Sequence, residues 1–137
     1  MDQSGLGGET MLRVAGGSVK INPTYPVVMG CGDTDRLIGE MHDDIECNVL
    51  LLNEGENRAV VIGVDALYPG STLRGYLEDR FSGRLAPEQI FLAASHTHSA
   101  PQLDPTKPLL GSVDQMHLET VSRRIGNLVE TLLQQSG

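Results

Sequence analysis

The sequence predicts an α/β fold built on a mixed β-sheet, and three observations lead to this prediction. Two strand-like segments at 46–53 and 58–64 are joined by a short turn that contains glycine, which is typical of a β-hairpin. The second segment is followed by a helix-like segment at 72–81 and an apolar run at 89–94, the order of a βαβ unit. A final segment at 115–134 has the spacing of an amphipathic helix. We therefore expect a hairpin, a right-handed parallel crossover and a C-terminal helix packed on one sheet.

The N-terminal region changes composition after its first residues. Residues 1–11 are mainly glycine and polar side chains, so we expect a flexible leader followed by a single α/β domain at 12–137. The domain starts with a strand at 12–21. Its adjacent Gly16 and Gly17 are typical of a β-bulge or of a close approach by another segment, and we interpret the strand as bulged.

The hairpin strands differ in their apolar pattern. In the first strand Cys47, Val49 and Leu51 alternate with residues of the opposite face, as expected for a strand with two unlike faces. The second strand, 58–64, is almost entirely apolar, which indicates a central position in the sheet. It ends at Asp65. This carboxylate is either a functional group at a strand end or a residue that caps a helix or closes a loop.

The βαβ unit brings two polar positions together. Leucines and an aromatic residue recur every four positions in the helix at 72–81, and Ser71 is the expected N-cap. The run at 89–94 predicts a strand buried on both faces in the middle of the sheet. Because the two strands of a βαβ unit are parallel, Asp65 and His96 are expected at the same edge of the sheet, where ligands bind in α/β folds.

The residues that follow the apolar run change at once to Ser-His-Thr-His-Ser, from 95 to 99. If the strand stays extended, His96 and His98 point to the same face with Cα atoms roughly 6.6 Å apart. Two imidazoles at that separation can bind one metal ion, or one metal and one substrate, and zinc suits imidazole with oxygen co-ligands. The alternative is that both histidines cap the strand end and bond to backbone.

The last part of the chain supplies a loop and a helix. The loop at 99–113 contains three prolines and lies next to the predicted site, so we expect it to cover or line that site. Asp114 is the expected N-cap of the helix at 115–134. His117, near the start of this helix, is predicted to lie on the surface.

The composition restricts the partners of this chain. It has 137 residues, with 18 acidic against 10 basic side chains and a formal net charge of −8, so nucleic acid and anionic membranes are disfavoured. The sequence contains no apolar run long enough for a membrane span and no secretory signal pattern, which predicts a cytoplasmic protein.

The chain has two cysteines, Cys31 and Cys47. We predict that both are buried free thiols, and the alternatives are one disulfide between them or a thiolate that binds a metal.

Several motifs resemble the neutral/alkaline, non-lysosomal ceramidase family. The segment Ser-His-Thr-His-Ser-Ala-Pro at 95–101 is similar to the Thr-His-Thr-His-Ser-x-Pro signature of that family. Upstream, 19–23 looks like its opening Asp-Ile-Thr-Pro segment, 41–47 is similar to its Gly-Ile-His segment, and 64–67 looks like its Ala-Asp-Leu segment. The motifs occur in the family order, and the resemblance covers about residues 12–134.

The resemblance implies a zinc-dependent hydrolase of amide bonds, acting on ceramide (an N-acyl-sphingosine) or a related lipid amide. By this resemblance His96 is a zinc ligand, His98 contacts the substrate or the oxyanion of the reaction, and Asp65 joins the catalytic group. His42 and Ser99 are then expected to line the substrate site. Members of the family are several times longer and bring further ligands from downstream sequence, so we expect the site to be incomplete in a 137-residue chain.

An alternative function is a non-catalytic α/β module that keeps the family fold and binds a small ligand or another subunit. Either function is compatible with self-association, because a truncated sheet exposes an edge strand that can pair with another copy. The sequence therefore also predicts a homo-oligomer, or association with a missing C-terminal domain.

Overall fold

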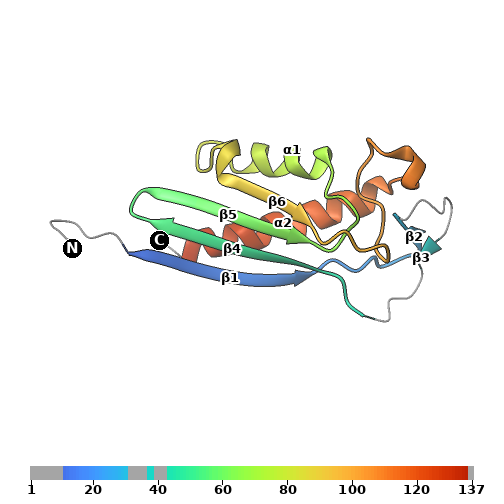
Figure 1. Ribbon diagram of the computed structural model, residues 1–137, viewed down its shortest axis with the longest axis horizontal. Coiled ribbons are helices and arrows are strands. Elements are labelled where there is room, and N and C mark those ends of the chain that lie inside the picture. The colour runs from blue at the N-terminus through green and yellow to red at the C-terminus, as the bar shows by residue number, and fades with distance from the viewer. Residues whose placement is uncertain (1–10, 31–36, 39–42, 136–137) are drawn as a thin grey trace.

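A computed structural model describes residues 11–30, 37–38 and 43–135 (Figure 1). Residues 1–10 of the predicted leader lie outside the described residues. The strands and helices, including two short 3-10 helices η1 and η2, have the following bounds: β1 Leu12–Lys20, β2 Val27–Val28, β3 Leu37–Ile38, β4 Glu46–Glu54, β5 Asn57–Val64, α1 Ser71–Arg80, η1 Pro87–Gln89, β6 Ile90–Ala94, η2 Pro108–Leu110 and α2 Gln115–Gln135.

The main sheet is mixed and has the strand order β1-β4-β5-β6. β1 pairs antiparallel with β4, and β4 forms the predicted hairpin with β5. β5 and β6 are parallel, with Val60 opposite Ile90 and Val64 opposite Ala94. The α/β fold class, the hairpin and the parallel pairing across α1 are thus confirmed.

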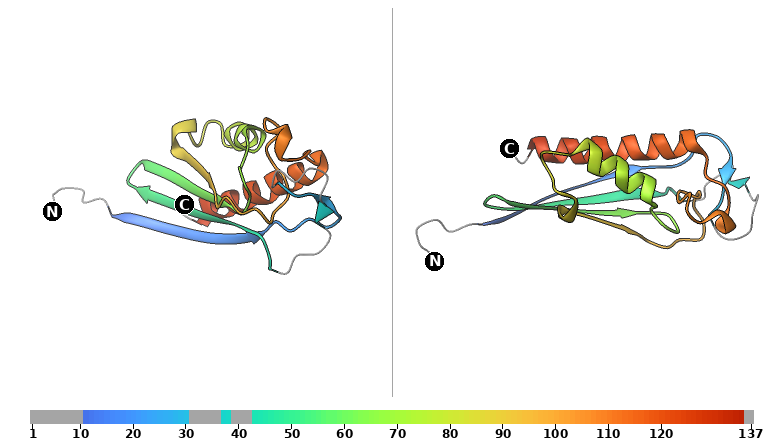
Figure 2. Two further views of the ribbon diagram at one scale, coloured as in Figure 1. Left: turned by 45° about the vertical axis from the view of Figure 1, so that its right-hand side comes forward. Right: turned by 90° about the horizontal axis from the view of Figure 1, so that it is seen from above.

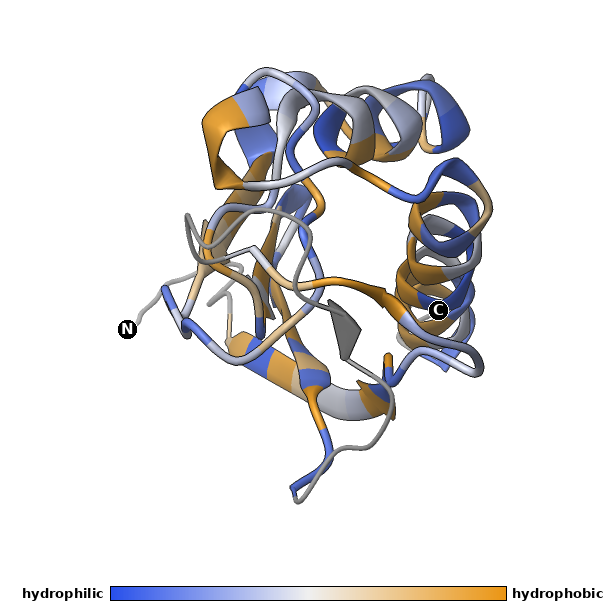
Figure 3. Ribbon diagram, turned by 90° about the vertical axis from the view of Figure 1, so that its right-hand side faces the viewer, coloured by the Kyte–Doolittle hydropathy of each residue, from blue (hydrophilic) through white to orange (hydrophobic). Residues whose placement is uncertain are grey.

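Both helices lie on the same side of this sheet, which gives a two-layer arrangement (Figure 2). α2 packs across β1 and β4, and α1 packs beside α2. The helix surfaces that face the sheet are mainly hydrophobic, whereas those that face away are mainly hydrophilic (Figure 3). The core between the layers is therefore mainly aliphatic, and Phe81 adds a buried aromatic ring. Its fully buried side chains include Val49, Leu51, Val60, Ile62, Leu73, Leu77, Phe81, Leu118, Val121 and Ile125.

β1 is a regular strand, so the predicted bulge is wrong. Its pairing runs without interruption from Leu12 opposite Glu54 to Lys20 opposite Glu46. The glycine pair instead marks a close approach, because a Cβ atom on Gly17 would lie 2.8 Å from the Leu128 Cδ1 atom of α2. A glycine at this position lets the C-terminal helix pack directly on the strand backbone.

β6 is an edge strand, and the prediction that it is central and buried on both faces is wrong. It pairs with β5 on one side only. Ile90 is buried beneath the helices, but Phe91 on the opposite face is 55% exposed. The apolar run was therefore misleading: only alternate residues of this strand enter the core, and the others face outward.

The start of α1 also differs from the prediction. Ser71 is the first helical residue, and the N-cap is Gly70, which makes no side-chain cap hydrogen bond. Gly70 has a φ of 85°, and a Cβ atom there would lie 2.9 Å from the Leu103 carbonyl oxygen. A turn with positive φ and a close backbone neighbour requires glycine, so the cap position is decided by the long loop that contacts it.

The start of α2 follows the prediction, but His117 does not. Asp114 accepts a hydrogen bond from the His117 backbone N–H at 2.9 Å, which is the N-cap interaction. The Tyr25 hydroxyl donates to the same carboxylate oxygen at 2.7 Å. The His117 side chain is only 4% exposed, so it is a buried residue rather than a surface residue.

Among the described residues, no helix is both long enough and apolar enough to span a membrane.

Candidate functional site

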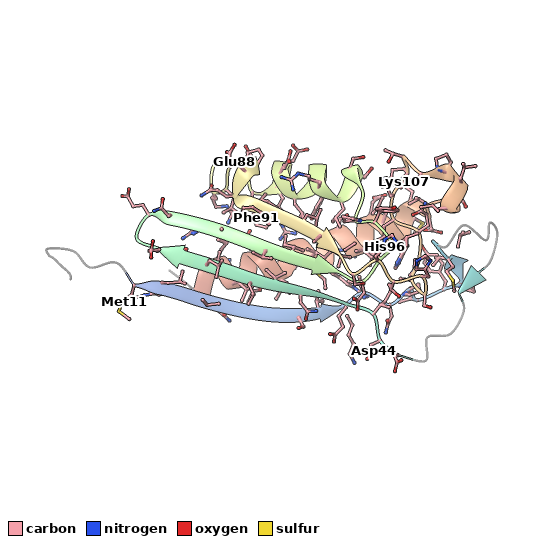
Figure 4. The ribbon with its side chains drawn as sticks, viewed as in Figure 1. Met11, Asp44, Glu88, Phe91, His96 and Lys107 are labelled. Carbon is pink, nitrogen blue, oxygen red and sulfur yellow. The ribbon has the colours of Figure 1, made fainter. Side chains whose placement is uncertain are left out.

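The candidate site lies where β5 and β6 end (Figure 4). The parallel pairing continues just past both strands, because the Ser95 N–H donates to the Val64 carbonyl at 2.9 Å. The His96 N–H likewise donates to the Ala66 carbonyl at 2.9 Å. These bonds hold the polar segment after β6 beside the segment after β5. The expectation that Asp65 and His96 emerge at the same edge of the sheet is confirmed.

His96 has an unusual backbone and a fixed ring. Its φ is 65°, and no other non-glycine residue in the described part of the chain has a positive φ. This left-handed conformation costs about 1–2 kcal/mol for a residue with a Cβ atom. The ring Nδ1 lies 3.0 Å from the Leu67 carbonyl oxygen, so Nδ1 carries the proton and donates to that oxygen. In this tautomer the neutral ring keeps its lone pair on Nε2, which is the form that a histidine metal ligand needs.

The two histidines lie close together, but not by the predicted route. The strand ends at Ala94, so the chain is not extended through His98. The positive φ of His96 turns the backbone instead, and the two imidazole rings meet edge-on with centroids 5.2 Å apart. The Tyr68 ring also meets His96 edge-on, with centroids 5.3 Å apart. His96 is thus held between an aromatic ring and a second imidazole.

The long loop contributes a lysine that sequence reasoning missed. The Lys107 ammonium lies 4.4 Å from the centroid of the Tyr68 ring, in a cation–π contact, and 2.6 Å from the Asp104 carboxylate. Figure 4 shows Lys107 and His96 at the same end of the sheet. A chain of contacts therefore runs from Asp104 through Lys107 and Tyr68 to His96. Nothing in the spacing of these residues indicates that the loop folds back over Tyr68.

Asp104 anchors this chain of contacts. Its side chain is almost fully buried and also accepts hydrogen bonds from the Thr106 hydroxyl and the Thr106 backbone N–H, at 2.6 and 3.0 Å. Burial disfavours the charged carboxylate, but the bonds from Lys107 and Thr106 outweigh that effect, and the pKa of Asp104 falls below its usual value. Buried Gln102 braces the same loop by donating to the Lys107 and Gly111 carbonyls. The loop thus reaches the candidate site through Lys107 and Tyr68, and its covering or lining of a functional site stays a prediction.

Asp65 has a structural contact in addition to its predicted catalytic role. One carboxylate oxygen accepts a hydrogen bond from the Glu46 backbone N–H at 3.0 Å, and the Asp65 N–H donates to the Glu46 carbonyl. These bonds close the end of the hairpin. The neighbouring Cys47 is a buried free thiol, as predicted; burial, with a contribution from the charge of Asp65, raises the pKa of its thiol to about 12.

The structure describes one of the two remaining predicted site residues, Ser99, but not the other, His42. Ser99 is exposed in the turn after His98, and its backbone N–H donates to the Thr97 hydroxyl at 3.2 Å. His42 and Cys31 lie outside the described residues. The roles assigned to His96, His98, Asp65, His42 and Ser99 therefore stay predictions.

The side chains near His96 offer some of the donors that a zinc ion needs. Nε2 of His96 suits one coordination position, and His98 is adjacent to it. A catalytic zinc usually has three protein ligands. In the part of the chain that the structure describes, no group of three or more His, Cys, Asp or Glu side chains is placed to hold a metal ion. The described residues therefore fit part of a zinc site.

A surface hollow of about 520 Å³ lies elsewhere on the molecule, between the C-terminal end of α1 and the start of β6. Its lining includes Glu78, Arg84 and Gln89. His96 follows the opposite end of β6, so this hollow is not part of the candidate site.

Comparison with solved structures shows which fold this is. The neutral ceramidase of Pseudomonas aeruginosa superposes with a TM-score of 0.78 over 93% of this chain, at 16% sequence identity. The chain has the fold of a segment of neutral ceramidase. A ceramidase in complex with C2 superposes with a TM-score of 0.77 over 92% of this chain, at 17% identity. The resemblance found in the sequence motifs is therefore confirmed at the level of the fold.

The shared part is a minor fraction of both ceramidases. This chain spans 22% of the length of each of them. No protein-family model matches the sequence, and no curated protein matches it at a significant level. Because both identities are low, the ceramidase comparison describes the fold, and the chemistry of this chain has to be argued from its own residues.

Proposed function

We propose that this chain is a ceramidase-like part of a zinc-dependent hydrolase of lipid amides, with His96 as a zinc ligand. The observation that supports the proposal is the way in which the ring and backbone of His96 are held. Its Nδ1 donates to the Leu67 carbonyl, the residue is exposed, and its backbone is held in a strained conformation at the end of a strand. Strain of this kind persists where surrounding structure over-determines it, and it clusters at functional sites. The ceramidase-like fold supports the choice of substrate class.

The residues of this chain have separate roles in the proposed reaction. A bound zinc ion would acidify water and polarise the amide carbonyl. His96 supplies a ligand with its tautomer already selected. His98, whose ring touches that of His96, donates a hydrogen bond to the oxyanion that develops on the amide oxygen. Asp65 adds a carboxylate at the same edge of the sheet, and His42 and Ser99 contact the substrate.

The proposed site needs further ligands from outside the described residues. This requirement follows from the ligand number of catalytic zinc and from the partial donor set around His96. We therefore expect zinc binding by this chain to be weaker than that of a complete catalytic site, and lipid-amide hydrolysis to need an added polypeptide segment. The cytoplasmic localisation stays a prediction.

Zinc affinity of purified protein tests the proposal. We expect His96→Ala to lower zinc affinity at least about tenfold, because loss of even a residue that only orients a metal ligand costs that much. Ser95→Ala is the matched control, because it removes a neighbouring side chain with no imidazole and should bind zinc like the wild type. Titration with a competing zinc chelator gives the affinity, and circular dichroism verifies the fold of each variant.

The outcomes separate the proposed function from its alternative. Equal zinc affinity in the wild type and His96→Ala would contradict the assignment of His96. In that case the non-catalytic binding module becomes the better description of this α/β domain. Zinc binding that depends on His96 without amide hydrolysis would agree with a partial site.

A further inference from the structure

The two helices leave one face of the main sheet uncovered (Figure 2). Residues of this face alternate with the buried ones along each strand. We call it the open face. Its exposed large apolar side chains are Leu12, Val14, Leu50, Val61 and Phe91, with exposed fractions of 59, 57, 47, 38 and 55%.

The strand register gathers these side chains into a continuous band. Gly16, Leu50, Val61 and Phe91 are direct neighbours across all four strands. The adjacent row, Val14, Leu52 and Ala59, is also apolar. On the other side, the row Ser18, Asn48, Gly63 and Ala93 is small and uncharged. Three neighbouring rows of the open face thus carry no charged side chain.

A contiguous exposed apolar patch of this kind is typical of an interaction site. We propose that the open face packs against the open face of a second copy of this chain. Two sheets with the same twist stack face to face with their strands nearly aligned, and a two-fold axis in the interface plane makes one patch complementary to itself. The net charge of −8 also favours this patch, because two like-charged copies approach with least repulsion through their uncharged band.

The size of the open face predicts a weak, reversible dimer. Four strands span about 14 Å between the outer two, and nine residues of β1 extend about 26 Å along the strand. These dimensions give a flat area of about 360 Å² for each face. Side chains that project from the sheet raise the accessible area buried by a pair of faces to the order of 1,000 Å², the lower limit for a specific interface. We therefore expect association in the micromolar range rather than an obligate dimer.

The sheet edges are less suited to self-association than the sequence predicts. On the β6 side, Arg74 of α1 donates to the Ile90 carbonyl at 3.0 Å and to the Pro87 carbonyl at 2.8 Å. On the β1 side, Arg124 donates to the Lys20 carbonyl at 3.1 Å. Cationic side chains at a strand edge hinder pairing with another strand. The open face is therefore a better site for self-association than either edge strand.

Sedimentation equilibrium over a range of concentrations tests the dimer. We expect the wild type to be dimeric at about 0.5 mM, well above the micromolar range of weak interfaces. Leu50→Lys places a charge at the centre of the open face and should weaken dimerisation at least tenfold. Phe91→Lys, at the edge of the same row, is the second variant (Figure 4). Leu109→Lys is the matched control, because Leu109 is 85% exposed and lies on η2, outside the open face.

Three results would overturn the proposal. The first is a wild type that stays monomeric throughout, whether or not it binds neutral lipid vesicles or another protein. The second is a dimer that persists in both Leu50→Lys and Phe91→Lys, which would indicate pairing through an edge strand. The third is equal weakening by Leu109→Lys. Circular dichroism verifies that each variant is folded, and none of these outcomes depends on zinc or hydrolase activity.

Discussion

At the scale of single residues, the candidate site is built from local constraints that act on His96. Its ring is held by the Leu67 carbonyl, by the edge of Tyr68 and by the His98 ring. Tyr68 in turn carries the Lys107 ammonium, which is paired with Asp104. The geometry of His96 therefore depends in part on the following loop, whose Lys107 reaches it through Tyr68.

The Asp104–Lys107 pair gives a prediction about stability. Lys107→Met keeps the length of the side chain but leaves a buried carboxylate without its cation, and we expect a loss of about 1–2 kcal/mol in the free energy of unfolding. Chemical denaturation at neutral pH measures this loss. Lys107 is partly exposed, so the cost stays below that of a fully buried ion pair.

Lys20→Met is the matched control for that experiment. Lys20 also pairs with an aspartate, Asp44, at 2.9 Å, but both side chains are largely exposed. Exposed pairs contribute little, so this variant should unfold like the wild type. The double variant Lys107→Met/Asp104→Asn should recover part of the loss, because the buried charge is removed together with its partner. Equal effects of the two lysine variants would contradict the role given to burial.

At the scale of elements, the position of α2 depends on close packing against β1. The helix has an amphipathic pattern over 21 residues, and its buried face covers the antiparallel half of the sheet. Gly17 allows the Leu128 side chain to reach the strand backbone. The contact joins the first strand of the sheet to the last helix of the chain, so it helps to close the core.

Substitution of Gly17 tests this contact. Gly17→Val puts a branched side chain where even a Cβ atom would be 2.8 Å from Leu128, and we expect a loss of about 1–3 kcal/mol in unfolding free energy. Gly63→Val is the control, since a Cβ atom at Gly63 has only the Asn48 carbonyl oxygen within 4 Å, at 4.0 Å. Valine favours strands, so this second variant should be neutral or stabilising. Thermal unfolding at low protein concentration compares the two, and a similar loss in both would show that the approach of α2 is not the cause.

At the scale of the whole molecule, stability should depend on pH through a buried histidine. Burial lowers the pKa of His117, although the charge of Asp114 acts in the opposite direction and that of Arg124 adds to the shift. The folded state therefore prefers neutral His117. Its contribution to stability is complete above the unfolded-state pKa of about 6.5 and is lost as pH falls through the lower folded-state pKa.

We expect the wild type to lose unfolding free energy between about pH 7.5 and pH 5.5, and His117→Gln to lose less over the same interval. The described carboxyl groups with lowered pKa values, among them Asp104 and Asp114, act only at lower pH, because their stabilisation is complete above about pH 4. Urea denaturation at a series of pH values measures the difference. Parallel pH profiles for the wild type and His117→Gln would refute the assignment to this residue.

The sequence by itself determined the order and type of the main elements, because hydrophobic period and turn residues are local properties. The sequence pattern predicts the hairpin, the parallel β5–β6 pair and the capped helix α2. It also predicts that Asp65 and His96 lie at one edge of the sheet. Tertiary structure decided which face of each strand is covered, why Gly16 and Gly17 are adjacent, and how Lys107 reaches Tyr68. These features depend on contacts between segments far apart in the chain. Val61 and Phe91 belong to apolar runs and yet lie on an exposed face, so only the packing of α1 and α2 on a single side reveals the open face.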